Sequence, residues 1–236
     1  MMADTLYLSL WYPDLRLAAL ADKLTAVLSS FAAHGGEPLV YSATVWPVDW
    51  SQPPVFQQVY GRRVGAAAGE GKAALGAEPA LAVAEALELL HEDFAYEFQI
   101  GWSLWELDAP APPQAVRSTP ELVQAVRPTP APPQAARWAR SPHMVHVTGF
   151  GPLFEEGTYQ SDGHIRIDFG SDTAFLAEDL DLDSIAARHV EENIRQLISL
   201  TAAVEKTSGA SARLLWSELG ESLAERLAER LGAKPQ

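Results

Sequence analysis

FAYEFQIGWSLWEL, residues 94–107, is the stretch that decides the fold class, because its side chains alternate between two kinds along the chain. The even-numbered residues from Phe94 to Leu104 are all large and apolar, whereas the odd-numbered ones include Glu97, Gln99 and Ser103. Side chains of a strand point to opposite faces with a period of two, so the stretch predicts one long strand with one buried face. Gly101 predicts a bend or bulge in it.

Other elements of the first half are placed around this strand by periodicity and by turn residues. They are a strand at 5–10, a helix at 17–31, strands at 39–46 and 55–60, and a helix at 79–91. Together with 94–107 they give the order strand–helix–strand–strand–helix–strand, which is the order of a ferredoxin-like antiparallel sheet with two helices on one face. In this arrangement we expect the first and last strands to lie side by side. The fold predicts no function, since it supports many.

Residues 108–142 differ from the rest of the chain in composition. Nine of the 17 prolines lie here, and a ten-residue unit recurs around Gln-Ala-Val/Ala-Arg at 114–117, 124–127 and 134–137. A unit so rich in proline does not form a core of its own, so we predict an extended linker made by tandem duplication. Its four arginines predict that it docks on the acidic region 151–192, which holds eleven Asp or Glu and two Arg.

The second half, 143–236, predicts strands at 144–150 and 164–169, joined by a hairpin that turns at Asp162-Gly163. Asp183 is a helix N-cap, and the buried positions of that helix are predicted to be Val190, Ile194, Leu197, Ile198, Thr201 and Val204. Residues 213–216 are either a short strand or the entry to a last helix at 217–231. We expect an α+β fold in which the hairpin and the two helices extend the first sheet, because two strands alone are marginally stable. One continuous domain is preferred over two stacked subdomains.

Composition excludes several classes of function. The 236 residues include no cysteine, so the chain forms no disulfide and no thiolate metal site. Its 17 Lys and Arg against 31 Asp and Glu give a net charge of −14, which repels nucleic acids and anionic membranes. No run of apolar residues is long enough to span a membrane, and the first residues lack the features of a signal peptide. We therefore expect a cytoplasmic protein.

Motifs for catalysis or cofactor binding are missing from the sequence. It contains no nucleophile elbow, no phosphate-binding loop and no HExxH zinc motif, so we predict no catalytic residue, no cofactor and no metal. Asp179, Asp181 and Asp183 have the spacing of a calcium loop, but Ser184 stands where that loop needs glycine. Negative charge before a helix N-terminus is favoured by the helix dipole, and this is the preferred explanation of the three residues.

Two hypotheses of function remain. The preferred one is a non-catalytic protein-interaction module that binds a protein partner or forms a homo-oligomer, because polar and aromatic residues share a sheet face without an assigned cover. Its predicted surface consists of Trp102, Trp105, Glu97, Gln99 and Trp50. Neutralisation of a basic toxin is one form of this hypothesis, since the chain is small and acidic. The alternative is an enzyme or small-molecule binder with a pocket around His146, His164 and Asp168.

Three blocks of the sequence resemble an uncharacterised bacterial protein family without a known activity. They are LHEDFAYEF with WSLW (90–98 and 102–105), GHIRIDFGSDTAFL (163–176) and AVEKTSGASARLLWSE (203–218). The resemblance implies that 108–142 is an insertion, and it carries over no residue role.

Overall fold

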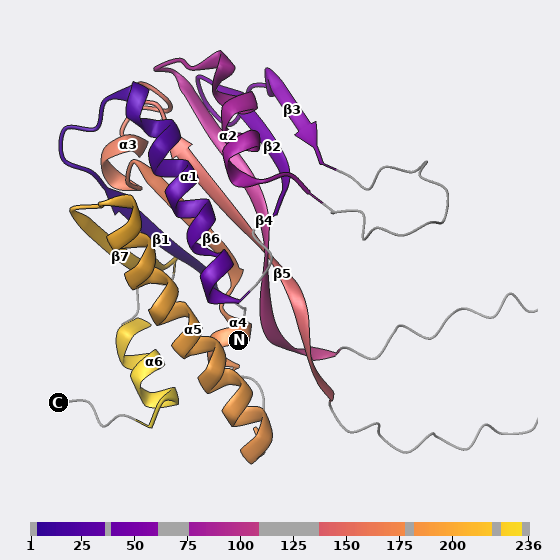
Figure 1. The fold of residues 1–236 in the computed structure, drawn as a ribbon. Helices are drawn as coiled ribbons and strands as arrows, with labels where there is room; N and C mark the ends of the chain where they lie inside the picture. The colour runs from indigo at the N-terminus through magenta and orange to yellow at the C-terminus, as the bar shows by residue number, and fades with distance from the viewer. Residues whose placement is uncertain are drawn as a thin grey trace, which may run out of the picture.

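The computed structural model describes residues 4–35, 39–60, 76–108, 137–177, 182–218 and 223–232 (Figure 1). In this part of the chain seven antiparallel strands form one sheet in the order β3-β2-β4-β5-β6-β1-β7. The strands are β1 (Thr5–Trp11), β2 (Val40–Pro47), β3 (Phe56–Val59), β4 (Phe94–Asp108), β5 (Arg137–Phe150), β6 (Ile165–Ser171) and β7 (Ala212–Ser217). The predicted α+β class is confirmed.

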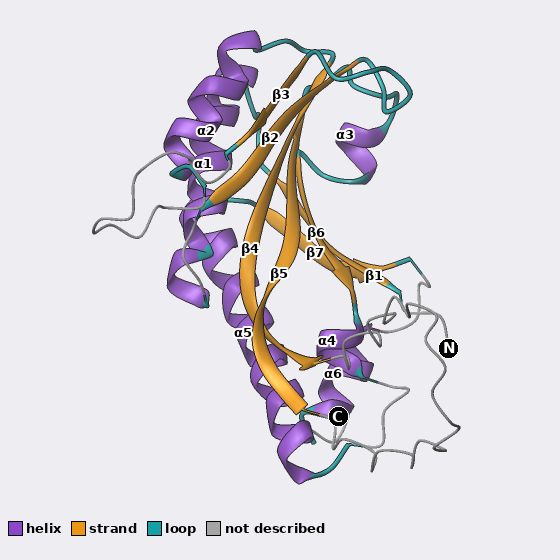
Figure 2. Ribbon diagram, turned by 90° about the vertical axis from the view of Figure 1, so that its right-hand side faces the viewer, coloured by secondary structure: helices purple, strands orange, loops and turns teal. Residues whose placement is uncertain are grey.

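Helices cover mainly one face of this sheet. They are α1 (Leu20–Ser30), α2 (Pro79–Ala86), α3 (Thr158–Ser161), α4 (Thr173–Leu176), α5 (Ser184–Ser208) and α6 (Leu223–Arg230), with short 3-10 turns at Leu17–Ala19, Ala32–His34 and Leu87–Leu89. Figure 2 shows α1, α2 and α5 on one side of the sheet and the short α3 on the other. We call the side opposite α1, α2 and α5 the open face.

Strand β4 forms the centre of the core, as its alternation predicts. Its buried face consists of Tyr96, Phe98, Ile100, Trp102 and Leu104, each 0% exposed. The Trp102 ring contacts Phe169 and Phe175 at centroid distances of 5.5 and 5.9 Å, and its Nε1–H donates to the His34 carbonyl at 2.7 Å. Burying one side chain of this size stabilises the fold by about 1.5–3 kcal/mol, so this face of β4 alone contributes a large part of the core.

The ferredoxin-like order is not confirmed, because β5 and β6 lie between β4 and β1. Strand β5 pairs with β4 from Ala95 opposite Phe150 to Asp108 opposite Arg137, so the second half of the chain occupies the edge of β4 that β1 was expected to take. Strand β1 pairs instead with β6 and β7. Strands β5 and β6, which follow the proline-rich region, are therefore inserted between strands that precede it. Residues 1–107 have no sheet of their own.

The proline-rich region is shorter than predicted at its second end. Strand β5 begins at Arg137, so 137–142 belong to the sheet, and the repeats at 109–136 lie outside the described residues. Arg137 and Arg140, two of the four arginines assigned to the linker, are thus strand residues, and the Arg140 guanidinium pairs with Glu192 of α5. Docking of the other linker arginines on the acidic region stays a prediction.

The connection between β5 and β6 is longer than a tight hairpin. It runs through α3, which the sequence analysis missed, before Gly163 turns the chain into β6 with a φ of 93°. The predicted cap of α5 is confirmed, since Asp183 accepts hydrogen bonds from the N–H groups of Ile185 and Ala186. Ile198 was expected to be buried on this helix, but it is 46% exposed.

Beyond the end of β2, the backbone groups along the edge of β4 form hydrogen bonds with Gly35 and with the Asn193 side chain of α5. The last pair between β2 and β4 is Val40 with Ile100, and beyond it the Ser103 N–H donates to the Gly35 carbonyl at 2.9 Å. The Trp105 N–H donates to Asn193 Oδ1 at 2.9 Å, and Asn193 Nδ2 donates to the carbonyls of Trp105 and Ala174, each at 2.8 Å. Asn193 is 0% exposed, so its amide acts as a buried strand partner that fixes α5 to β4.

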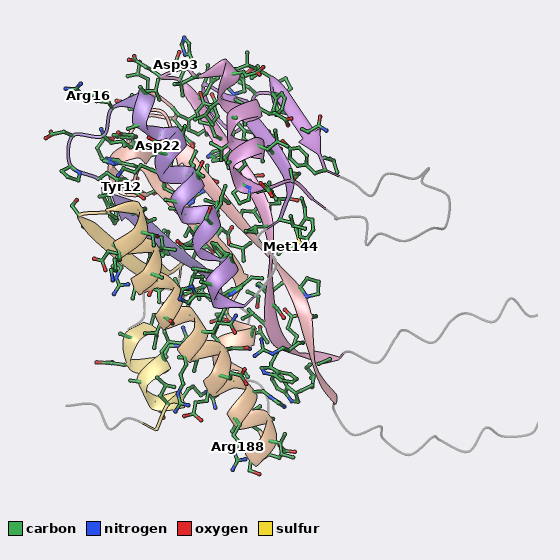
Figure 3. The ribbon with its side chains drawn as sticks, viewed as in Figure 1. Tyr12, Arg16, Asp22, Asp93, Met144 and Arg188 are labelled. Atoms are coloured by element: carbon green, nitrogen blue, oxygen red, sulfur yellow. The ribbon has the colours of Figure 1, made fainter. Side chains whose placement is uncertain are left out.

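Replacing Asn193 with Ala should destabilise the protein by about 3 kcal/mol, because buried backbone groups of Trp105 and Ala174 lose their partner. Chemical denaturation measures the free energy of unfolding directly. Arg188→Ala is the matched control, since Arg188 is exposed on the same helix (Figure 3). A loss of stability no larger than that of the control would show that the amide does not fix α5.

Candidate functional site

The open face carries a continuous row of side chains across all seven strands. Paired residues of neighbouring strands define the row, because directly opposed side chains lie on the same face. In strand order from β7 to β3 the central row is Trp216, Tyr7, Asp168, His146, Gln99, Ser42 and Val59. A second row beside it is Leu214, Ser9, Arg166, Thr148, Glu97, Thr44 and Gln57. The open face is therefore mainly polar where β4, β5 and β6 meet.

Two carboxylates and a histidine form the centre of this face. His146 is paired with Asp168 across β5 and β6, and its Nδ1 lies 3.5 Å from a carboxylate oxygen of Glu97. The hydrogen bond to Glu97, together with the charges of Glu97 and Asp168, raises the pKa of His146 although burial opposes the shift. The three side chains thus form a charged group that keeps a net negative charge when His146 is protonated.

Aromatic residues flank this group on the β1–β7 side. The Tyr7 and Trp216 rings stack with centroids 4.6 Å apart, and the Trp216 Nε1–H donates to Ser9 Oγ at 3.0 Å. The Tyr7 hydroxyl donates to Glu218, and burial, followed by this hydrogen bond, raises the pKa of Tyr7 to about 12. The guanidinium of Arg166 lies 5.5 Å from the Tyr7 ring centre. Tyr7 therefore stays a neutral hydrogen-bond donor at physiological pH.

One end of the open face is closed by a second, smaller apolar cluster. Phe150 and Phe154 are its buried members with Ala95, and Trp46, Trp50 and Tyr159 pack against them. The Trp50 ring lies edge-on to Phe154, with centroids 5.1 Å apart. The segment that contains α3 thus covers this end of the sheet and limits the polar surface to the middle of the strands.

The structure separates the residues of the predicted interaction surface. Glu97 and Gln99 lie together on the open face, and Trp50 lies at its closed end. Trp105 lies elsewhere, because its ring stacks on His189 of α5 at a centroid distance of 3.9 Å. Trp102 is 0% exposed in the core, where it cannot contact a partner. Trp102 is on the even-numbered side of β4, so the alternation that predicts the strand also predicts its burial.

The alternative pocket is not formed as a single group. His146 and Asp168 are neighbours, but His164 precedes Asp168 by four residues, a distance of about 13 Å along a strand. The His164 ring is stacked on Tyr159 with centroids 4.1 Å apart, and its Nδ1 accepts the Tyr12 N–H at 3.0 Å. Burial lowers the pKa of His164. His164 therefore anchors the segment around α3.

A second histidine–carboxylate pair, His143 with Glu106, was not predicted from the sequence. Glu106 lies 2.6 Å from His143 Nδ1 and also accepts the Ser141 hydroxyl, beside a cleft of about 220 Å³. The other ring nitrogen of His143 forms a hydrogen bond with the Phe169 carbonyl. Both ring nitrogens are thus occupied, and neither is available to act as a general acid or base on a substrate. The cross-strand position of Glu106 and His143 follows only from the register of β4 and β5, which sequence alone does not give.

Among the described residues, no three His, Asp or Glu side chains come together as a metal site. Asp179 and Asp181 lie outside these residues, and Asp183 caps α5. None of the described helices has the length and apolar character needed to cross a membrane. The chain matches no known protein family, no characterised protein and no solved structure.

The protonation of His146 tests the central group. Its pKa should lie above the ordinary 6.5 and should fall in Glu97→Gln, because the carboxylate that favours the charged ring is removed. Since the pKa is higher in the folded than in the unfolded protein, the contact stabilises the fold below about pH 6.5 and is lost as the pH rises through the folded pKa. NMR titration of the ring signals measures both values.

His164 is the internal control of the same titration. Its pKa should lie below 6.5 and should not change in Glu97→Gln, because burial under Tyr159 causes its shift. Equal titration of the two histidines would contradict the proposed environments.

Proposed function

We propose that this protein is a non-catalytic binding module whose open face binds a positively charged partner protein. The observation that carries the proposal is the continuous open row from Trp216 to Val59, with Glu97, His146 and Asp168 at its centre. Polar groups flanked by Tyr and Trp rings are typical of surfaces that bind proteins. The five inner members of the row lie on strands that are paired on both sides, so little conformational entropy is lost there on binding.

Charge supports a basic partner. The stretches 39–60, 76–108 and 141–165, which contain β2, β3, β4, most of β5 and also α2 on the other side of the sheet, hold twelve Asp or Glu and no Lys or Arg, and Arg166 is the one Lys or Arg residue in the two rows of the open face. A surface built from these strands attracts basic proteins over distances comparable to the Debye length and repels acidic ones. This asymmetry also disfavours self-association through this face, because two copies would bring like charges together. Neutralisation of a basic toxin is the biological role most compatible with these properties.

Chemistry at the open face is less well supported. Catalysis by His146 would need a substrate held beside it in a concave site. The cleft beside Glu106 and the depression beside Trp50 are lined by other residues, and His164 is engaged in packing at the closed end. Binding of a partner protein does not require a concave site beside His146, whereas binding of a small substrate does.

Gln99→Lys should weaken the binding of the partner by about tenfold, because it places a positive charge in the central row. The wild-type chain is used as bait in extracts of the native host, and captured proteins are identified by mass spectrometry. Affinities of the purified partner for both chains are then measured by calorimetry.

Gln58→Lys is the matched control, since Gln58 is exposed on β3 and paired with the buried Ala43 on the helix-covered side. It makes the same change of charge and should alter the affinity less than about twofold. Recovery of no basic partner would contradict the proposed function, and so would equal effects of the two variants.

A further inference from the structure

Three connections meet at the closed end of the molecule. They are the turn after β2, the turn before β4 and the start of the connection from β5 to β6 (Figure 1). The Val48 N–H donates to the Asp93 carbonyl at 2.7 Å, and the Leu153 N–H donates to the Glu92 carbonyl at 2.9 Å. Figure 3 shows Asp93 at this end. Backbone hydrogen bonds therefore fix the three connections to one another.

Two of these connections contain residues in the left-handed region of backbone conformation. Val48 has a φ of 60° and Glu155 a φ of 36°, and the Glu155 N–H donates to the Val48 carbonyl at 2.8 Å. Positive φ is unfavourable for a β-branched residue, and glycine would adopt it without penalty. The chain thus keeps a valine where glycine would stabilise the turn.

The side chains at this end combine exposed apolar groups with carboxylates. They line a shallow depression of about 520 Å³ and comprise Val48, Asp49, Trp50, Ser51, Leu153, Glu155 and Glu156, here called the loop patch. Val48 is 53% exposed and Leu153 is 62% exposed. Hydrogen bonds from Ser51 lower the pKa of Asp49, so this carboxylate stays charged. The Trp50 ring is held edge-on between Phe154 and Phe150, with centroid distances of 5.1 and 6.3 Å.

We propose that the loop patch is the anchor site for a basic segment of the partner protein, in which an apolar side chain lies flanked by Lys or Arg residues. The apolar side chain would bury Val48 and Leu153, and the flanking cations would pair with Asp49, Glu155 and Glu156. Charge complementarity supports this occupant, because the three connections that form the loop patch contain no Lys or Arg. A second copy of this acidic chain is disfavoured for the same reason. The inference rests on the proposed function and adds the chemistry of the partner.

A short peptide of alternating lysine and leucine is the probe, and an alternating glutamate and leucine peptide is its control. The chain has seven Trp residues, whose indole N–H signals report by NMR on separate parts of the surface. We expect the basic peptide to shift the Trp50 signal, assigned with Trp50→Phe, and to leave that of the buried Trp102 unchanged. No shift at Trp50 would overturn the proposal.

Glu155→Lys with Glu156→Lys should weaken binding of the basic peptide by at least about tenfold. Glu225→Lys with Glu229→Lys makes the same change of charge on exposed positions of α6, at the other end of the molecule, and should change the affinity less than about twofold (Figure 1). Equal effects of the two pairs would mean that only the overall charge attracts the peptide and would overturn the anchor site.

Val48→Gly separates binding from folding. It should raise the melting temperature, because glycine adopts the positive φ without strain. It should also weaken the binding of the peptide, because the exposed apolar side chain of Val48 is lost. Unchanged peptide affinity in this variant would contradict the role of Val48. If the native partner binds the Glu155/Glu156 variant normally but not Gln99→Lys, the anchor site fails while the proposed function stands.

Discussion

The pairing of β4 with β5 is the contact on which the rest of the structure depends. It is the longest pairing in the sheet, and it joins residues on the two sides of the proline-rich region. It places the apolar face of β4 beneath the helices and brings His146 beside Gln99 on the other face. Removing it would separate β2 and β3 from β6, β1 and β7, since the order of the sheet offers no second connection between them.

Local pattern predicted the elements well and their partners poorly. The alternation in 94–107 and the cap at Asp183 each depend on neighbouring residues, and each is found in the structure, which also chooses the strand from the two alternatives at 213–216. Strand order depends on contacts between distant segments, and the ferredoxin-like element order of 1–107 gave no sign that β5 would displace β1 from the edge of β4. Propensity also could not locate α3, because this four-residue helix is tied to the fold through Tyr159, which packs against the cluster of Ala95, Phe150 and Phe154.

The same limit applies to the candidate site. The period of β4 placed Glu97 and Gln99 on one face, but their neighbours His146, Asp168 and Tyr7 came together only through the register of four strands. The pKa of a histidine depends on the side chains that surround it in the folded protein. The pKa values of His146, within β5, and His164, just before β6, are therefore shifted in opposite directions, which their sequence neighbours do not reveal. The loop patch combines residues about a hundred positions apart, and no sequence motif marks it.

The β4–β5 pair also explains how the chain tolerates its internal duplication. Asp108 and Arg137 are opposed at the end of the two strands, so the 28 intervening residues begin and end at one point of the fold. The entropy of closing a loop rises only with the logarithm of its length, and one more ten-residue unit costs about 0.3 kcal/mol. Adding or removing one copy of the repeat should therefore change the free energy of unfolding very little, because both ends of the insertion stay at the same point of the sheet.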